Sequence, residues 1–175
     1  RNAVEVSAVA TTAGSYTVVV SDGGSYLNGT GTYRLHLVRA PSEPTTGPSD
    51  EGGPLANGAT SPASIHQGDL DVWSFTAEIG ESIVLRAGEV NDLGGTGGFT
   101  PGLRLYGPNG SLVASELGNA NAVEVEATAT LSGQYLAVVS DGGSYIDGAG
   151  TYRLHLAKTP GVLEISAGDE GGPLT

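Results

Sequence analysis

The stretch Thr151-Tyr-Arg-Leu-His-Leu156 decides the fold class, because large apolar side chains alternate along it with charged or polar ones. Successive side chains of a β-strand point to opposite faces, so a period of two predicts a strand with one buried face. We expect the tyrosine and both leucines to point into a core, and Arg153 and His155 to face solvent.

The same six residues occur earlier as Thr32-Tyr-Arg-Leu-His-Leu37, and the two copies are 119 positions apart. Three further stretches recur at this offset: Asn2–Val6 with Asn121–Val125, Ser21–Tyr26 with Ser140–Tyr145, and Glu51–Leu55 with Glu170–Leu174. A spacing that holds without any insertion indicates two copies of one folded unit. The sequence therefore predicts a tandem repeat with a 119-residue period.

The positions of the repeats predict how the chain is divided. We expect residues 57–158 to hold one complete unit and residues 1–39 to be the C-terminal part of a preceding unit. Residues 40–56 contain a run rich in Pro, Ser and Thr, which is typical of an extended linker, and residues 159–175 would lead to the next repeat. Because part of a sandwich exposes unpaired strand edges, we expect neighbouring copies of the unit as partners, joined in an array or by strand complementation.

Within the complete unit, short alternating runs are separated by Gly, Pro, Asn and Asp and recur at intervals of roughly 8–12 residues. The expected strands cover residues 63–66, 71–77, 82–87, 103–106, 111–114, 123–127, 134–140 and 151–156. Trp73 and Phe75 should share one face of the second strand, and Asn109-Gly110 suits a tight hairpin. The pattern predicts an all-β protein with a jelly-roll-like antiparallel β-sandwich.

The composition excludes several classes of partner. Seven Lys and Arg residues stand against 19 Asp and Glu residues, for a net charge of −12. Nucleic acids and anionic membrane surfaces require a basic patch, so neither is an expected partner. No apolar run approaches the ~20 residues that span a bilayer, so we expect no membrane insertion.

Five stretches of the complete unit together resemble the bacterial pre-peptidase C-terminal domain. They are Gly68-Asp-Leu-Asp-Val-Trp-Ser-Phe75, Gly80-Glu-Ser-Ile-Val-Leu85, Leu103-Arg-Leu-Tyr-Gly-Pro-Asn-Gly-Ser-Leu112, Gly133-Gln-Tyr-Leu-Ala-Val-Val139 and Gly150-Thr-Tyr-Arg-Leu-His-Leu156. The resemblance implies a secreted jelly-roll sandwich of the kind found beside proteases and in long repetitive surface proteins, sometimes with bound calcium. An extracellular or cell-surface location follows as an expectation.

Calcium is the cofactor that the residues suggest, because Ca²⁺ binds carboxylate, amide and carbonyl oxygens gathered on a loop. The candidate ligands are Asp141 and Asp147 on one glycine-rich loop, their counterparts Asp22 and Asn28, a second acidic loop with Glu89, Asn91 and Asp92, and Asp69 and Asp71 at the start of a strand. The alternative is that these residues form tight turns and a soluble acidic surface.

The sequence does not predict an enzyme. Of the three histidines, His36 and His155 are copies of each other, and the complete unit holds only His66 and His155. Neither has the neighbours that nucleophilic catalysis or a zinc site requires. Tyr26 and its copy Tyr145 lie in glycine-rich loops, where an exposed ring could contact a neighbouring unit or a sugar, or fold over the end of the sandwich.

Three functions remain open at this point. The first is a structural module of a secreted bacterial repeat protein that forms an extracellular fibre, stalk or surface layer, with calcium at the joints. The second is a non-catalytic accessory domain of a secreted protease or other hydrolase. The third is an adhesin module that binds carbohydrate or matrix, for which the single tryptophan, Trp73, is a poor basis.

Overall fold

The computed structural model describes residues 3–42, 44, 47, 50–95, 97–118 and 120–168, which form nine β-strands and no helix. The chain divides into two compact units, one of Arg1–Val4 with His36–Thr175 and one of Glu5–Leu35. Each unit is described by itself. In the described part of the chain, nothing resembles a helix long and apolar enough to cross a membrane.

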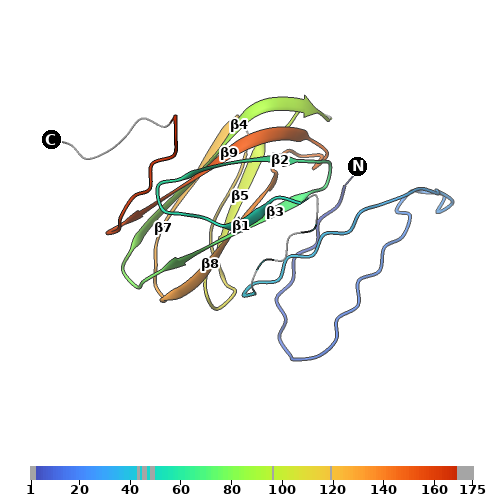
Figure 1. Ribbon diagram of the computed structural model, residues 1–175. Helices are drawn as coiled ribbons and strands as arrows, with labels where there is room; N and C mark the ends of the chain where they lie inside the picture. The colour runs from blue at the N-terminus through green and yellow to red at the C-terminus, as the bar shows by residue number, and fades with distance from the viewer. Residues whose placement is uncertain are drawn as a thin grey trace. The chain divides into compact units, whose positions relative to one another are not determined.

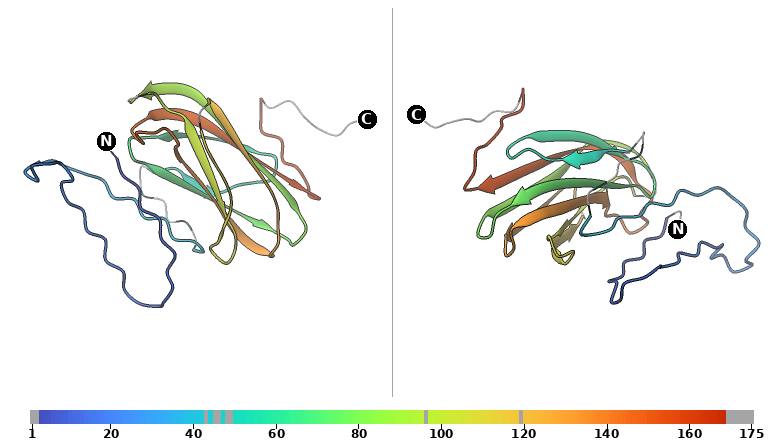
Figure 2. Two further views of the ribbon diagram at one scale, coloured as in Figure 1. Left: turned by 180° about the vertical axis from the view of Figure 1, so that it is seen from behind. Right: turned by 60° about the horizontal axis from the view of Figure 1, so that its bottom comes forward.

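All nine strands belong to the first unit and form two sheets (Figure 1). The five-stranded sheet has the order β1 (Gly52–Pro54), β3 (Leu70–Ala77), β8 (Gly133–Asp141), β5 (Pro101–Tyr106) and β6 (Leu112–Leu117). The four-stranded sheet has the order β2 (Thr60–Ile65), β9 (Ala149–Thr159), β4 (Ser82–Gly94) and β7 (Ala122–Thr128). Figure 2 shows the two sheets as facing layers, so the predicted β-sandwich is confirmed.

One strand pair departs from the predicted antiparallel arrangement. β1 pairs with β3 in parallel, with Gly52 opposite Val72, whereas the other pairs are antiparallel. β1 also lies within residues 40–56, the predicted linker, and Leu55 after it is buried in the core. The reason is that the Gly-Gly-Pro stretch adds to the open edge of β3, and Pro, which lacks an N–H donor, is tolerated on such an edge strand.

The core lies between the sheets and follows the alternation in the sequence. Tyr152, Leu154 and Leu156 of β9 are buried, while Arg153 between them is exposed and His155 is half-buried. Trp73 and Phe75 of β3 are buried on the same face, as predicted. The remaining large core side chains include Ile65, Ile83, Leu85, Phe99, Leu103, Leu105, Val123, Val125, Tyr135 and Val139.

The second acidic loop predicted at Glu89, Asn91 and Asp92 is not a loop. These residues continue β4, which runs to Gly94 and pairs with β9 through two register irregularities, between Glu89 and Asn91 and between Asp92 and Gly94. These irregularities let β4 stay paired with β9 beyond the apolar core. This end of the strand therefore carries polar side chains, without the alternation of a strand that covers a core.

The second unit, Glu5–Leu35, contains none of the described strands. Its large apolar side chains, such as Val18 and Tyr33, are mostly exposed. Its assignment to a preceding repeat stays a prediction, as does the connector role of residues 159–175, of which residues 169–175 lie outside the described residues.

Candidate metal centre

Four carboxylates meet at the end of the sandwich where β1 and β3 begin. Asp50 and Glu51 directly precede β1, Asp69 directly precedes β3, and Asp71 is on β3. Continued backward, the parallel register that sets Gly52 opposite Val72 places Glu51 beside Asp71 and Asp50 beside Leu70, the neighbour of Asp69. The cluster is therefore a direct consequence of the one parallel pairing in the fold.

Asp71 is the buried member of this carboxylate cluster, with an exposed fraction of 0%. Its Oδ2 accepts a hydrogen bond of 2.6 Å from the Tyr152 hydroxyl, which in turn accepts one of 2.9 Å from Trp73 Nε1. Its Oδ1 is also buried and accepts no hydrogen bond from the described residues. Burial raises the pKa of Asp71 to about 8, with smaller contributions from the neighbouring carboxylates, against a lowering by the tyrosine hydrogen bond.

The two residues before β1 also have buried carboxylate oxygens without a hydrogen-bond donor among the described residues. Asp50 Oδ1 and Glu51 Oε2 are buried and receive no hydrogen bond within the part of the chain that the structure describes. Glu51 Oε1, in contrast, accepts a 2.6 Å hydrogen bond from Ser64 Oγ. Burial, followed by the negative charge of Asp69, raises the pKa of Asp50 above its ordinary value.

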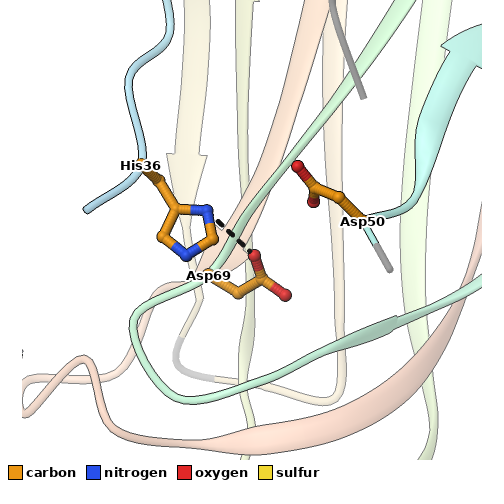
Figure 3. Close-up of side chains that lie close together, drawn as sticks. All are labelled: His36, Asp50 and Asp69. Atoms are coloured by element: carbon orange, nitrogen blue, oxygen red, sulfur yellow. Dashed lines mark ion pairs between the residues drawn. The ribbon is translucent and has the colours of Figure 1, made fainter. Parts of the chain in front are cut away.

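Asp69 connects the cluster to two histidines, of which Figure 3 shows His36. Its Oδ1 lies 3.4 Å from His36 Nδ1, and its Oδ2 lies 3.5 Å from His66 Nδ1. Ligand atoms of His36, Asp50 and Asp69 all lie within 4.8 Å of one another, the one such group of three among the described residues. His36 belongs to the earlier copy of the Thr-Tyr-Arg-Leu-His-Leu stretch.

This donor set fits a hard divalent cation. Buried carboxylates are normally paired or hydrogen-bonded, and each unpaired charge of this kind is costly. Here three buried carboxylate oxygens lack a donor among the described side chains and backbone groups. Ca²⁺ takes six to eight oxygen ligands and would neutralise the repulsion that the carboxylates exert on one another. Calcium at this position stays a prediction, since only Asp50 and Asp69 of the four carboxylates belong, with His36, to the described group of ligand atoms within 4.8 Å.

Two other predicted ligands, Asp141 at the end of β8 and Asp92 on β4, already receive hydrogen bonds from the protein itself. Asp141 accepts hydrogen bonds from three backbone amides, those of Thr100 at 3.2 Å, Gly143 at 3.0 Å and Gly148 at 2.8 Å. Asp92 likewise accepts from two backbone amides at 2.9 and 3.3 Å. These carboxylates hold loops together, which agrees with the alternative that the sequence left open.

The remaining candidates do not join the carboxylate cluster. Asp147 is buried in the loop after Asp141, whereas Asn28 is exposed. Glu89 is half-buried on β4, and Asn91 Nδ2 lies 3.3 Å from Thr151 Oγ1 across the sheet.

Asp22 repeats the arrangement at Asp141, because its two oxygens accept from the amides of Gly24 at 2.9 Å and Gly29 at 2.7 Å. These two hydrogen bonds lower the pKa of Asp22. Tyr26 and Tyr145, in the corresponding loops, are 89% and 50% exposed, so neither ring is folded into a core. Their role as contacts for a neighbouring unit stays a prediction.

Sequence reasoning missed Asp50, Glu51 and His36 as members of the cluster. The signal that could have found the first two is their place in the repeated stretch Asp50–Leu55, whose copy begins at Asp169. A recurring acidic pair beside a recurring Gly-Gly-Pro indicates a constraint beyond solubility.

The chain is similar to known proteins only at the level of solved structures. No family model matches the chain, and no curated protein matches it. Among solved structures, the pre-peptidase C-terminal domain of a collagenase from Bacillus anthracis is 22% identical, with a TM-score of 0.48, over 61% of this chain and 95% of that one. PliG from Aeromonas hydrophila, a periplasmic inhibitor of g-type lysozyme, is 15% identical with a TM-score of 0.47, over 63% of this chain and 98% of its own. A pre-peptidase C-terminal domain, the family that the sequence resembles, is thus among the solved structures to which the chain is similar.

Proposed function

We propose that the chain is a non-catalytic structural module of an extracellular repeat protein that assembles into a fibre, stalk or surface layer. Ca²⁺, bound by Asp50, Glu51, Asp69 and Asp71, stabilises the joint at which one repeat meets the next. The ion supplies charge neutralisation and fixes the connector against the sandwich.

The observation that carries this proposal is the buried carboxylate cluster. Asp71 is fully buried with one oxygen that no described donor reaches, and three further acidic side chains surround it. A sandwich whose only requirement was solubility would place these charges in water, where they cost nothing. A bound cation would offset the cost of burying these charges.

The position of the cluster favours a role at joints between repeats. The connector residues Asp50 and Glu51 recur as Asp169 and Glu170, and His36 recurs as His155. An array built on this period would repeat these three residues at every joint. Repetition of a site along a chain multiplies length and stiffness, whereas nothing in the cluster pairs a nucleophile with a base.

Calcium titration of the full chain tests the proposal. We expect saturable binding by isothermal titration calorimetry and a higher melting temperature in Ca²⁺ than in EGTA, because a ligand specific to the folded state stabilises it. Asp69→Asn should lose most of this response. Asp92→Asn is the matched control, since Asp92 is an acidic residue outside the cluster whose Oδ1 accepts backbone hydrogen bonds that an amide oxygen can keep. An equal calcium response in both variants, or none in the native chain, would contradict the proposal.

A further inference from the structure

Residues 4–37 expose large apolar side chains in the alternating pattern of buried strand faces. Seven of them are between 61% and 91% exposed: Val4, Val6, Tyr16, Val18, Tyr33, Leu35 and Leu37. A soluble protein rarely leaves so many apolar side chains in water unless another surface covers them.

The residues 119 positions later show where side chains of this pattern lie in the complete sandwich. These counterparts lie on β7, β8 and β9 and are at most 5% exposed: Val123, Val125, Tyr135, Ala137, Tyr152, Leu154 and Leu156. Each of these seven exposed positions in the first copy thus corresponds to a core position in the second. The first copy carries the inner face of three sandwich strands.

The local structure of the first copy agrees with this correspondence. The Tyr16 hydroxyl donates to Thr12 O at 2.8 Å, and the Tyr135 hydroxyl donates to Leu131 O at 2.9 Å, four residues back in both cases. The loop carboxylates at positions 22 and 141 each accept from backbone amides two and seven residues ahead. In the same loops, Leu27 and Ile146 both adopt a left-handed conformation, with φ of 51° and 56°. The first copy therefore keeps the turns of the sandwich although its strands lack partners among the described residues.

The complete sandwich shows which strands would pair with the first copy. β8 lies between β3 and β5, β9 lies between β2 and β4, and β7 pairs with β4. The complement of residues 3–37 is consequently a half-sandwich of the β1–β6 type, residues 52–117.

We propose that residues 3–37 can take the places of β7, β8 and β9 on the β1–β6 half of a second copy of this chain. Exchange of identical elements between copies is a low-cost route to assembly. In each chain, residues 122–156 already close the sandwich, so the exchange becomes measurable when their core contact is weakened. The inference deepens the proposed function, because it names the partner through which a fibre would grow.

The test uses the full chain with Leu154→Asp, which places a charge in the core and prevents residues 122–156 from closing the sandwich. We expect this variant to stay folded through residues 3–37 of a second copy and to run as dimers or larger species in light scattering. The double variant Leu35→Asp/Leu154→Asp should lose the cooperative unfolding transition. Leu35→Asp alone is the control and should remain folded, because Leu35 is exposed.

Two outcomes would overturn the inference. A Leu154→Asp chain as unfolded as the double variant would show that residues 3–37 cannot replace β7–β9. A folded monomer would show closure within one chain in place of a second copy.

A peptide measurement covers the case in which Leu154→Asp aggregates. A peptide of residues 3–37 should restore a cooperative transition to the double variant in a saturable manner, and the same peptide with Leu35→Asp should not. Absence of any rescue would also overturn the inference. Each arm is repeated in EGTA, so that failure of the calcium site and failure of the strand exchange give different results.

Discussion

Asp71→Asn is expected to stabilise the protein in a chelator and to abolish its stabilisation by calcium. The amide has the size of the carboxylate and can still accept the hydrogen bond from the Tyr152 hydroxyl. It carries no charge, so it removes both the cost of burying an anion and the anion that the cation requires. The two effects have opposite signs, which makes the substitution diagnostic.

The magnitude follows from the pKa of Asp71, which rises from the ordinary 3.8 to about 8 in the folded protein. The folded state then binds the proton more tightly than the unfolded state, so stability falls as the pH rises from about 4 to about 8. The loss is about 1.4 kcal/mol for each pH unit in that window, or about 6 kcal/mol in total as an upper limit. Asp71→Asn should remove this part of the pH dependence, and in EGTA its advantage over the native chain should grow with pH.

Urea unfolding followed by tryptophan fluorescence measures these differences, because Trp73 is the single tryptophan and donates to the Tyr152 hydroxyl in the cluster. The native chain in EGTA should be less stable at pH 8 than at pH 5, and Ca²⁺ should reverse the loss. Glu126→Gln, at an exposed position of β7, is the control and should follow the native chain. Equal native stability at both pH values in EGTA, or a variant less stable than the native chain at pH 8, would refute the reasoning.

Three further substitutions separate the core from the cluster and the loops. Tyr152→Phe leaves Trp73 Nε1 and Asp71 Oδ2 without their partner and should lower the free energy of unfolding in urea by about 2–5 kcal/mol. A loss below that of an exposed Tyr→Phe change would argue against these two hydrogen bonds. Leu105→Ala should cost about 2–5 kcal/mol, whereas Leu117→Ala, at a half-exposed position, should change the midpoint little; similar losses would contradict the assigned core. Asp141→Ala removes the acceptor of three backbone amides and should lower the melting temperature equally with and without Ca²⁺, while Asp22→Ala should leave the sandwich transition unchanged. Dependence of the Asp141→Ala effect on calcium would move the cation to that loop.

Most of the fold could be predicted from the sequence, because strand faces depend on local alternation. The inward positions of Tyr152, Leu154 and Leu156 and of Trp73 and Phe75 follow from a period of two, and all five are buried. β4 was expected to end at Ala87, because the alternation stops there, yet pairing with β9 continues to Gly94 through the register irregularities.

The candidate metal centre could be predicted only in part. Asp69 and Asp71 stand out as a spaced acidic pair before an aromatic strand, and both belong to the cluster. Asp50 and Glu51 join them through the parallel pairing of β1 with β3, a contact between residues some twenty positions apart that no local pattern encodes. In Asp22 and Asp141 the same residue type instead accepts backbone hydrogen bonds, and the sequence alone does not separate the two uses.

Electron microscopy of the native material, in Ca²⁺ and again after chelation with EGTA, tests the central claim most directly. The account predicts continuous filaments with a regular axial repeat of one or a few sandwich lengths, which loosen or come apart when calcium is removed. Isolated particles without a repeat in both conditions would contradict a structural role for the module, and filaments indifferent to EGTA would contradict calcium at the joints.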